Sequence, residues 1–308
     1  MSFTPAAPSA MDYAHPTSRP YDNTPPGART SETPGADRHS PARGKLRAFA
    51  WLGHSRTVEE RLAGTGSEDR FDELARMAVQ EPWEMPMTAE PGSLGILKYY
   101  VTWTFEQALL TEAVLPSPDA DMCVFNTGLI TRQHEDIYGI FRPNHRPDQQ
   151  DWILAGWLVA GAPQLDVFPE LPSAAVYSQD PLSYVYDWDL PLDFSARQLI
   201  PLISGLLPAG LKEFSLGLEL MLAGAVNRAR DIAKRYPGTA VPAWQPGGTE
   251  IQLLLPLYLA DPATPDAALV LSRGDTTYRC TAIVSPAQGY KEARLITRPT
   301  AHWLDSLT

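Results

Sequence analysis

The sequence predicts an α+β protein with a mostly antiparallel sheet, packed helices and a disordered N-terminal tail. Its composition is that of a globular protein, since 44% of the 308 residues are hydrophobic and 20% are charged. Segments with helical and strand spacing follow one another in blocks of helices, strands, helices and strands, which differs from strict βαβ alternation. Prolines are dense in the first 45 residues, so the folded part is expected to begin after them.

The first 45 residues are expected to be disordered. Pro, Ser, Thr, Ala and Gly dominate them without apolar periodicity, so they cannot bury enough apolar surface to offset the entropy of ordering. They also lack the apolar run of a secretory signal and the Arg-rich character of a transit peptide. The alternative is a partly ordered arm that clasps a partner subunit. Residues 46–308 are predicted to form a single α+β domain.

The domain is predicted to open with a short adapter and two helices. Ser67 is expected to cap an amphipathic helix over residues 67–80, which has acidic residues in its first turn. Ser93 is expected to open a second helix over residues 94–114, with Leu110 on its buried face. Prolines close both helices.

Strand-like runs follow, rich in β-branched and aromatic residues and separated by polar turns. They span residues 122–131, 136–143 and 151–161, and they predict an antiparallel meander. Residues 180–194 are rich in Asp, Pro and aromatic residues and are expected to form a long irregular excursion. Long loops inside a compact domain are often functional.

The second half of the domain is predicted to contain two helices and then strands. The helices cover residues 196–207 and 211–236, and the second ends at Pro237 and Gly238 with basic residues in its last turn. Four short runs at strand spacing are then expected at residues 251–260, 266–273, 277–285 and 293–298.

The net charge of −11 argues against one class of function. The first 45 residues hold five basic and four acidic residues, so the acidity belongs to the domain. Non-specific duplex binders present Lys and Arg to a polyanion, and we therefore expect no duplex nucleic acid as a partner. A small ligand, or a short single strand in a local basic groove, stays possible. No run of 18 apolar residues occurs, so no membrane span is expected.

The cysteines and the absence of known motifs limit which redox, cofactor and metal sites the sequence predicts. Cys123 and Cys280 lie in apolar strand-like runs and are expected to be reduced thiols of a cytoplasmic protein. No GxGxxG, P-loop, HExxH, CxxC or GxSxG motif is present, so the sequence leaves the cofactor unknown. A metal site would need residues 134–136 with His145, but adjacent residues in a turn are usually just solvated, so we expect no metal.

Asn126, Thr127 and Gly128 interrupt an otherwise apolar strand. Glycine inside a strand often marks a bulge or a close backbone approach, and the amide and hydroxyl beside it offer hydrogen bonds at that opening. Two interpretations stay open. The polar groups bind the neighbouring backbone of a bulge, or they contact a ligand.

Asn227, Arg228 and Arg230 follow a very apolar stretch in the helix end AVNRARD, and at least one of them is expected to turn inward or toward a cleft. An inward arginine must be paired. Either a carboxylate such as Glu106 or Glu219 pairs with it, or it binds phosphate. Gln252 and Arg294 are similar polar positions at the margins of predicted strands.

Five blocks occur in a fixed order, namely FDELARMA…PW, ILKYYVTWTFEQ, FNTGLIT…IYGIF, IQLLLPLYL…DAALVL and GYKEARLITRP…WL. Together they resemble the DUF3825 family, a bacterial group, over residues 70–304. The last family block usually reads AYNNARL. Here Lys291 and Glu292 replace two asparagines while Tyr290 and Arg294 persist, which implies an altered specificity or a lost activity if the asparagines touch ligand.

The resemblance also implies a cellular context for the protein. Some relatives look as if they carry cold-shock or similar RNA-binding modules, which implies RNA or nucleotide contexts. This chain has the predicted tail in that place, which weakens an RNA role. Its Ala-, Arg- and Pro-rich composition resembles that of actinobacterial proteins, in which such domains can serve specialised metabolism.

The leading functional hypothesis is an enzyme that acts on a small nucleotide or phosphoribosyl compound by hydrolysis. Glu106 is the acid/base candidate. The predicted substrate-binding residues are Asn126, Thr127, Arg228, Gln252, Tyr290 and Arg294. Of these, Asn126, Arg228 and Arg294 are expected to converge on one phosphate-bearing ligand.

Two rival hypotheses remain. The first is a non-catalytic binder of nucleotide or single-stranded RNA, with stacking supplied by Tyr177, Tyr184, Tyr186 and Trp188. The second is a scaffolding or regulatory subunit whose polar positions are structural. The sequence leaves the oligomeric state open.

Overall fold

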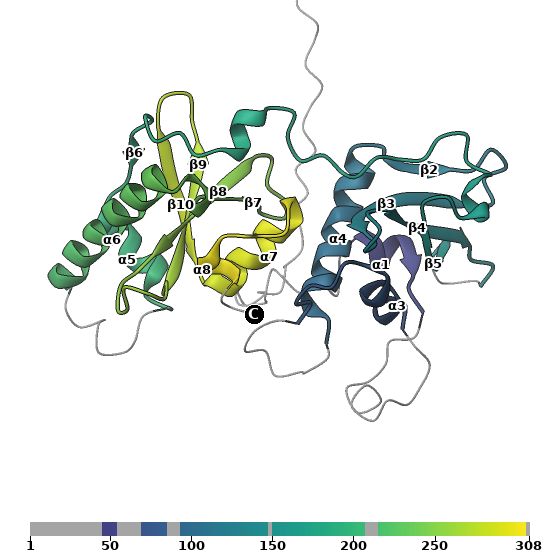
Figure 1. Cartoon of the computed structure of the whole chain (residues 1–308), viewed down its shortest axis with the longest axis horizontal. Coiled ribbons are helices and arrows are strands. Elements are labelled where there is room, and N and C mark those ends of the chain that lie inside the picture. The colour runs from purple at the N-terminus through teal and green to yellow at the C-terminus, as the bar shows by residue number, and fades with distance from the viewer. Residues whose placement is uncertain (1–44, 54–68, 85–92, 147–149, 207–214, 306–308) are drawn as a thin grey trace, which may run out of the picture. The chain divides into compact units, whose positions relative to one another are not determined.

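Two five-stranded sheets and the helices that pack on them make up the fold (Figure 1). The computed structural model describes residues 45–53, 69–84, 93–146, 150–206 and 215–305. Residues 40–308 form one compact unit. Both sheets are mostly antiparallel, which confirms the predicted α+β class. The predicted tail, residues 1–45, lies outside the described residues except for Lys45.

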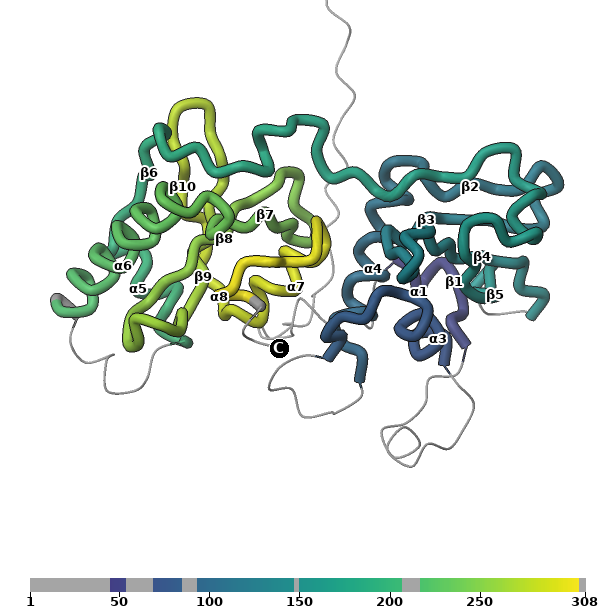
Figure 2. Tube along the Cα trace, viewed as in Figure 1, coloured from purple at the N-terminus to yellow at the C-terminus, as the bar shows by residue number. Residues whose placement is uncertain are grey.

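The first sheet has the strand order β1-β5-β4-β3-β2. Its strands are β1 (Ala50–Trp51), β2 (Val114–Pro116), β3 (Cys123–Ile130), β4 (Asp136–Pro143) and β5 (Trp152–Val159). Strands β3, β4 and β5 pair antiparallel in sequence order, so the predicted meander is confirmed, and Figure 2 lets the eye follow the trace through it. The short edge strands β1 and β2 are not predicted by the sequence pattern.

Two helices near the start of the domain precede this meander. The first, α1 (Lys45–Phe49), buries Leu46. The next, α3 (Arg70–Met77), begins at an Asp69 cap, whose carboxylate accepts a hydrogen bond from the backbone N–H of Asp72 at 2.8 Å. Ser67, the predicted cap, lies outside the described residues.

Helix α4 (Gly95–Leu110) is mostly buried, as its apolar sequence predicts. Its cap position is taken by Leu94, in a left-handed backbone conformation and without a side-chain hydrogen bond. The prediction that Ser93 caps this helix is therefore wrong. Leu110 is 64% exposed, so its predicted burial is also wrong. It is the last residue of α4, where the chain turns away toward β2.

A cluster of aromatic rings joins α4 to the first sheet. Phe105 packs edge-on against Phe125 at 5.0 Å and Phe141 at 5.4 Å between ring centroids, and all three rings are fully buried. Gly139 of β4 makes room for them. A Cβ atom at Gly139 would collide with the Phe125 ring and lie 2.9 Å from Cζ3 of Trp157, so this position tolerates no side chain without repacking.

The second sheet has the order β6-β10-β9-β8-β7. Its strands are β6 (Leu192–Asp193), β7 (Val241–Trp244), β8 (Ile251–Leu257), β9 (Ala267–Arg273) and β10 (Tyr278–Val284), and its helices are α5 (Ala196–Ile203), α6 (Ser215–Arg235), α7 (Pro286–Ile296) and α8 (His302–Asp305). Strands β7 to β10 are antiparallel, and β6 pairs parallel with β10.

Helices cover both faces of this sheet, and its interior strand β8 is accordingly buried throughout. Successive side chains of a strand point to opposite faces. Leu253 and Leu255 belong to the core cluster that contains α5 and α6 residues, whereas Leu254 belongs to the cluster that contains Tyr290 and Ala293 of α7. Helices α6 and α7 thus lie on opposite faces of the second sheet.

The prediction of a last strand at residues 293–298 is wrong, because most of this segment is the end of α7. The start signal of the helix lies upstream. Ser285 caps it by accepting from the backbone N–H of Gln288 at 3.2 Å, and Pro286 occupies the first turn. The residues LIT at positions 295–297 include two β-branched residues, which locally favour a strand. They lie at the end of a helix that begins at Pro286.

None of the described helices is long and apolar enough to cross a membrane. Cys123 is buried and Cys280 is half-buried, and neither forms a disulfide. Burial raises the pKa of each thiol to about 11. Both cysteines are therefore protonated near neutral pH.

Candidate functional site

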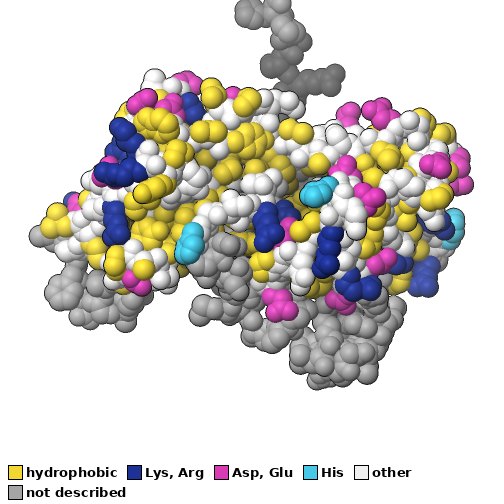
Figure 3. Space-filling view, in the orientation of Figure 1, with side chains coloured by type: hydrophobic (Ala, Val, Ile, Leu, Met, Phe, Trp, Pro, Cys, Tyr) yellow, Lys and Arg dark blue, Asp and Glu magenta, His cyan; other side chains and the backbone are white. Residues whose placement is uncertain are grey.

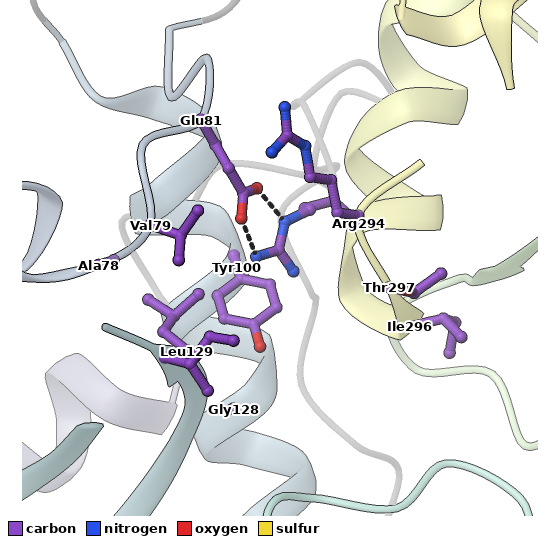
Figure 4. A pocket seen from close by; sticks show the side chains of 11 residues that line it. Ala78, Val79, Glu81, Tyr100, Gly128, Leu129, Arg294, Ile296 and Thr297 are labelled. Carbon is purple, nitrogen blue, oxygen red and sulfur yellow. Dashed lines mark hydrogen bonds and ion pairs between the residues drawn. The ribbon is translucent and has the colours of Figure 1, made fainter. Parts of the chain in front are cut away.

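A cavity of about 290 Å³ lies where four segments of the chain meet (Figure 4). One segment follows α3, one is α4, one is the end of β3, and one is the end of α7 with the residues after it. The lining residues are Ala78, Val79, Glu81, Tyr100, Gly128, Leu129, Ile130, Arg294, Ile296, Thr297 and Arg298. A hydrogen bond from the backbone N–H of Val79 to the carbonyl of Ile130, at 2.8 Å, ties the first segment to the end of β3.

A buried ion pair forms one wall of this cavity. Nε and Nη2 of Arg294 donate to the two carboxylate oxygens of Glu81 at 2.6 and 3.0 Å, and only 7% and 8% of the two side chains is exposed. Taking two charges out of water is costly unless they are paired with good geometry. The fork-to-carboxylate arrangement meets that condition.

Two aromatic rings hold the guanidinium of Arg294 in place. Its Cζ lies 4.4 Å from the ring centre of Tyr100 and 5.3 Å from that of Trp83. Burial by itself lowers the pKa of Arg294, but the Tyr100 phenol and the Glu81 carboxylate outweigh it and the pKa is raised. The guanidinium thus stays charged at the wall of the cavity, over the ring of Tyr100.

Asn126 and Thr127 of β3 form hydrogen bonds with the backbone near the end of this strand, where Gly128, Leu129 and Ile130 line the cavity. Oδ1 of Asn126 accepts from the N–H of Gly128 at 2.8 Å, and Oγ1 of Thr127 accepts from the N–H of Leu129 while donating to the carbonyl of Ile137. The register shifts between Asn126 and Ile130. Of the two interpretations left open by the sequence, these contacts match the bulge whose polar groups bind neighbouring backbone.

Gly128 is required at this bulge for two reasons. Its φ is +70°, which L-residues with a side chain rarely adopt. A Cβ atom there would lie 2.6 Å from the hydroxyl of Tyr100. The bulge therefore lets the strand pass close beneath the tyrosine that stacks on Arg294.

Arg298 brings a second positive charge to the cavity. It is exposed, and in the described part of the chain no carboxylate is ion-paired with it. Because Glu81 is the one carboxylate among the described residues of the lining and is bound by Arg294, these residues carry a net positive charge within a chain of net charge −11. An anion would be favoured there.

Arg228 lies apart from this cavity. It is exposed on α6 and stacks on Tyr258 at 5.2 Å, and its Nη2 donates to the carbonyl of Pro262 at 3.2 Å. Since α6 and α7 cover opposite faces of the second sheet, Arg228 and Arg294 do not converge, contrary to the sequence-based expectation. Neither Glu106 nor Glu219 is ion-paired with Arg228.

The other predicted site residues besides Arg294 also lie outside the cavity lining, namely Glu106, Asn126, Thr127, Gln252 and Tyr290. Glu106 is ion-paired with Lys45, with 3.3 Å between Oε1 and Nζ. Nε2 of Gln252 on β8 lies 3.4 Å from the hydroxyl of Ser272 on the adjacent strand β9 and 3.4 Å from that of Thr281 on β10. Tyr290 is buried in the hydrophobic core beneath α7. Their ligand roles stay predictions without support from this cavity.

The aromatic residues of the excursion after residue 176 mostly contact protein. Tyr177 packs on Trp244 at 5.2 Å, and Tyr186 stacks on Tyr278 at 5.1 Å. The hydroxyl of Tyr184 bonds backbone atoms of Ser178. Of the four residues suggested for stacking with bases, these three are therefore engaged, while Trp188 is largely exposed.

Sequence reasoning missed Glu81, Tyr100 and Arg298. Glu81 and Arg294 lie 213 positions apart, so no local spacing connects them. Tyr100 belongs to a helix with apolar residues all round, where it resembles a core residue. In the described part of the chain no group of three His, Cys, Asp or Glu side chains could hold a metal ion.

The fold and the cavity define an α+β domain with a ligand-sized, cationic cavity walled by a buried ion pair. The chain belongs to the DUF3825 family, described as a domain of unknown function, with a match over residues 74–303. This match confirms the resemblance found in the five sequence blocks. No curated protein and no solved structure matches the chain significantly.

Proposed function

We propose that this protein binds a small phosphorylated ligand, a nucleotide or phosphoribosyl compound, in the cavity between Glu81, Tyr100, Gly128 and Arg294. The observation that carries the proposal is the net positive lining of this cavity in an acidic chain. Among the described residues that line the cavity, Arg298 is not ion-paired with a carboxylate. Arg294 keeps one guanidinium nitrogen, Nη1, that does not donate to Glu81. A phosphate accepts hydrogen bonds from both kinds of group.

The size of the cavity supports a small ligand. About 290 Å³ is at the lower end of the range for small-molecule sites, which suits a phosphate with its sugar better than a dinucleotide. A duplex partner is not supported. On the face shown in Figure 3, Lys and Arg side chains lie in small separate groups among other residue types rather than in one basic surface. The unpaired cysteines support a reducing, cytoplasmic setting.

Binding is better supported than hydrolysis. A hydrolase needs a general base within reach of the ligand. Glu81 is the one carboxylate that the described part of the chain contributes to the lining, and Arg294 binds both of its oxygens. Glu106, the acid/base candidate from the sequence, is held by Lys45 and does not line the cavity. We therefore expect Glu106→Gln to leave ligand binding, and any turnover of nucleoside monophosphates followed by product analysis, unchanged. A loss of turnover in this variant would return Glu106 to the active site.

Substitution of Arg298 tests the binding proposal. Ribose 5-phosphate and AMP should each raise the thermal unfolding temperature of the wild type, because a ligand that binds only the folded state stabilises it. Arg298→Ala should fold normally, since Arg298 is exposed, and should bind both ligands at this cavity about 10- to 100-fold more weakly. A hydrogen bond to a charged group is worth about 1.5–3 kcal/mol, and each 1.4 kcal/mol is about a factor of ten.

Arg279→Ala is the matched control, because it removes the same charge from an exposed position on β10. It should bind as the wild type does in isothermal titration calorimetry. Equal weakening in both variants would mean that only the overall charge matters. Absence of any stabilisation of the wild type by phosphorylated ligands would overturn the proposal.

A further inference from the structure

A second cavity, of about 370 Å³, lies at the end of α6. Its walls are the last turn of α6 with the 3₁₀ turn at Pro237–Thr239, the chain that follows β8, and the residues leading into α8. The aromatic side chains of its lining are Tyr236, Tyr258, His302 and Trp303. None of its lining residues is shared with the cavity at Arg294.

Tyr236 presents an open aromatic surface at this cavity. It is 68% exposed, so most of its ring has no protein partner, whereas large aromatic rings usually bury their area in the fold. Trp303 lines the same cavity. It is buried, and its Nε1 donates to the carbonyl of Thr239 at 2.9 Å. A side chain that is already held in place loses little conformational entropy when a planar ligand binds beside it.

Arg228 supplies a cation at the edge of the same cavity. Arg228, Ile232 and Tyr236 are spaced four residues apart, so they lie along one side of the helix end, and the latter two line the cavity. The guanidinium of Arg228 lies over Tyr258, another lining residue. The guanidinium of Arg228 donates a hydrogen bond to the neutral carbonyl of Pro262, and none of the described carboxylates is ion-paired with it.

We propose that this cavity is a second ligand site that takes a nucleoside 5′-monophosphate, with the base stacked on Tyr236 and the phosphate held by Arg228. Aromatic rings beside an arginine recognise bases by stacking and phosphates by charge, and such stacking tolerates different bases. This site is independent of the phosphate site at Arg294 and Arg298. The same chemistry is presented by a free nucleotide and by a nucleotide within a single strand.

Two variants separate the base from the phosphate. Tyr236→Ala and Arg228→Ala both alter exposed side chains and should fold normally. In titration calorimetry with AMP, Tyr236→Ala should weaken binding at this site by roughly 5- to 100-fold, the range for loss of one stacked base. Arg228→Ala should weaken AMP binding similarly but leave adenosine binding within about twofold, because adenosine carries no phosphate.

Controls keep this site distinct from the first cavity. Arg197→Ala removes an exposed charge from α5 and should bind AMP as the wild type does. Ribose 5-phosphate lacks a base, so its binding should respond to Arg298→Ala and not to Tyr236→Ala. If AMP binding is unchanged in both Tyr236→Ala and Arg228→Ala, this second site does not exist, whatever Arg298→Ala shows.

A comparison of AMP with an adenylate oligonucleotide identifies the source of the nucleotide. Tighter binding of the oligonucleotide, lost in both variants, assigns a single strand to the site. Binding of the oligonucleotide that is equal to or weaker than that of AMP assigns a free nucleotide. An oligonucleotide that binds tightly and equally well to the wild type and both variants would overturn the assignment of this surface.

Discussion

Glu81→Met is expected to lower the free energy of unfolding by about 3–5 kcal/mol, because it leaves the Arg294 guanidinium buried without its counter-charge. Arg294→Met should cost a similar amount by orphaning Glu81. The double variant Glu81→Met/Arg294→Met should recover most of the loss, since two apolar side chains of comparable length replace a pair that is costly to desolvate. Urea unfolding with an unchanged m-value measures all three.

Arg228→Ala is the reference for this series. Its side chain is exposed and makes one stacking contact and one hydrogen bond to a carbonyl, so the loss should be within about 1 kcal/mol. Single variants at Glu81 and Arg294 that cost as little as Arg228→Ala would show that the pair is not buried in solution. A double variant no more stable than the singles would place the energy in packing rather than in charge.

Phe105→Ala is expected to cost about 3–5 kcal/mol, the range for removal of a fully buried aromatic ring. Phe105 links α4 to β3 and β4 through its contacts with Phe125 and Phe141. Gly139 has no side chain that could fill the void left beside Phe125. The neighbouring residues can therefore close this void only in part. The loss should appear as a lower urea midpoint without a change in m-value.

Phe105→Leu is the matched control and should lose clearly less, because most of the apolar volume is kept. The two variants together separate cavity formation from loss of ring contacts. A loss below about 1 kcal/mol for Phe105→Ala would contradict the view that this cluster anchors α4 to the first sheet.

Much of the fold follows from local sequence pattern. The alternation and β-branching of residues 122–161 predict a meander that the structure confirms, since each strand pairs with the next along the chain. The error at residues 293–298 has a local cause and a distant one. The residues LIT favour a strand locally, whereas Ser285 and Pro286, eight or more positions upstream, start a helix that packs Ala293 into the core.

The site is predictable only in part. Arg294 stands out because a charged residue interrupts an apolar run, and the bulge at Asn126 stands out because polar residues interrupt a strand. A local sequence pattern does not predict Glu81 as the partner of Arg294, because tertiary packing alone brings the two residues together. Arg228 shows the opposite case. Its helix is predicted correctly, but the face of the sheet that the helix covers is decided by packing.

The protonated state of the two cysteines has a practical consequence for mapping ligands. With a pKa of about 11 for Cys123 and Cys280, only about one thiol in ten thousand is a thiolate at pH 7, and the thiolate is the nucleophile. The native chain should therefore react slowly with maleimides. A cysteine introduced at an exposed position beside either cavity should therefore be labelled by a maleimide fluorophore much faster than Cys123 and Cys280. Ligand binding in each of the two cavities can then be followed separately in the same protein.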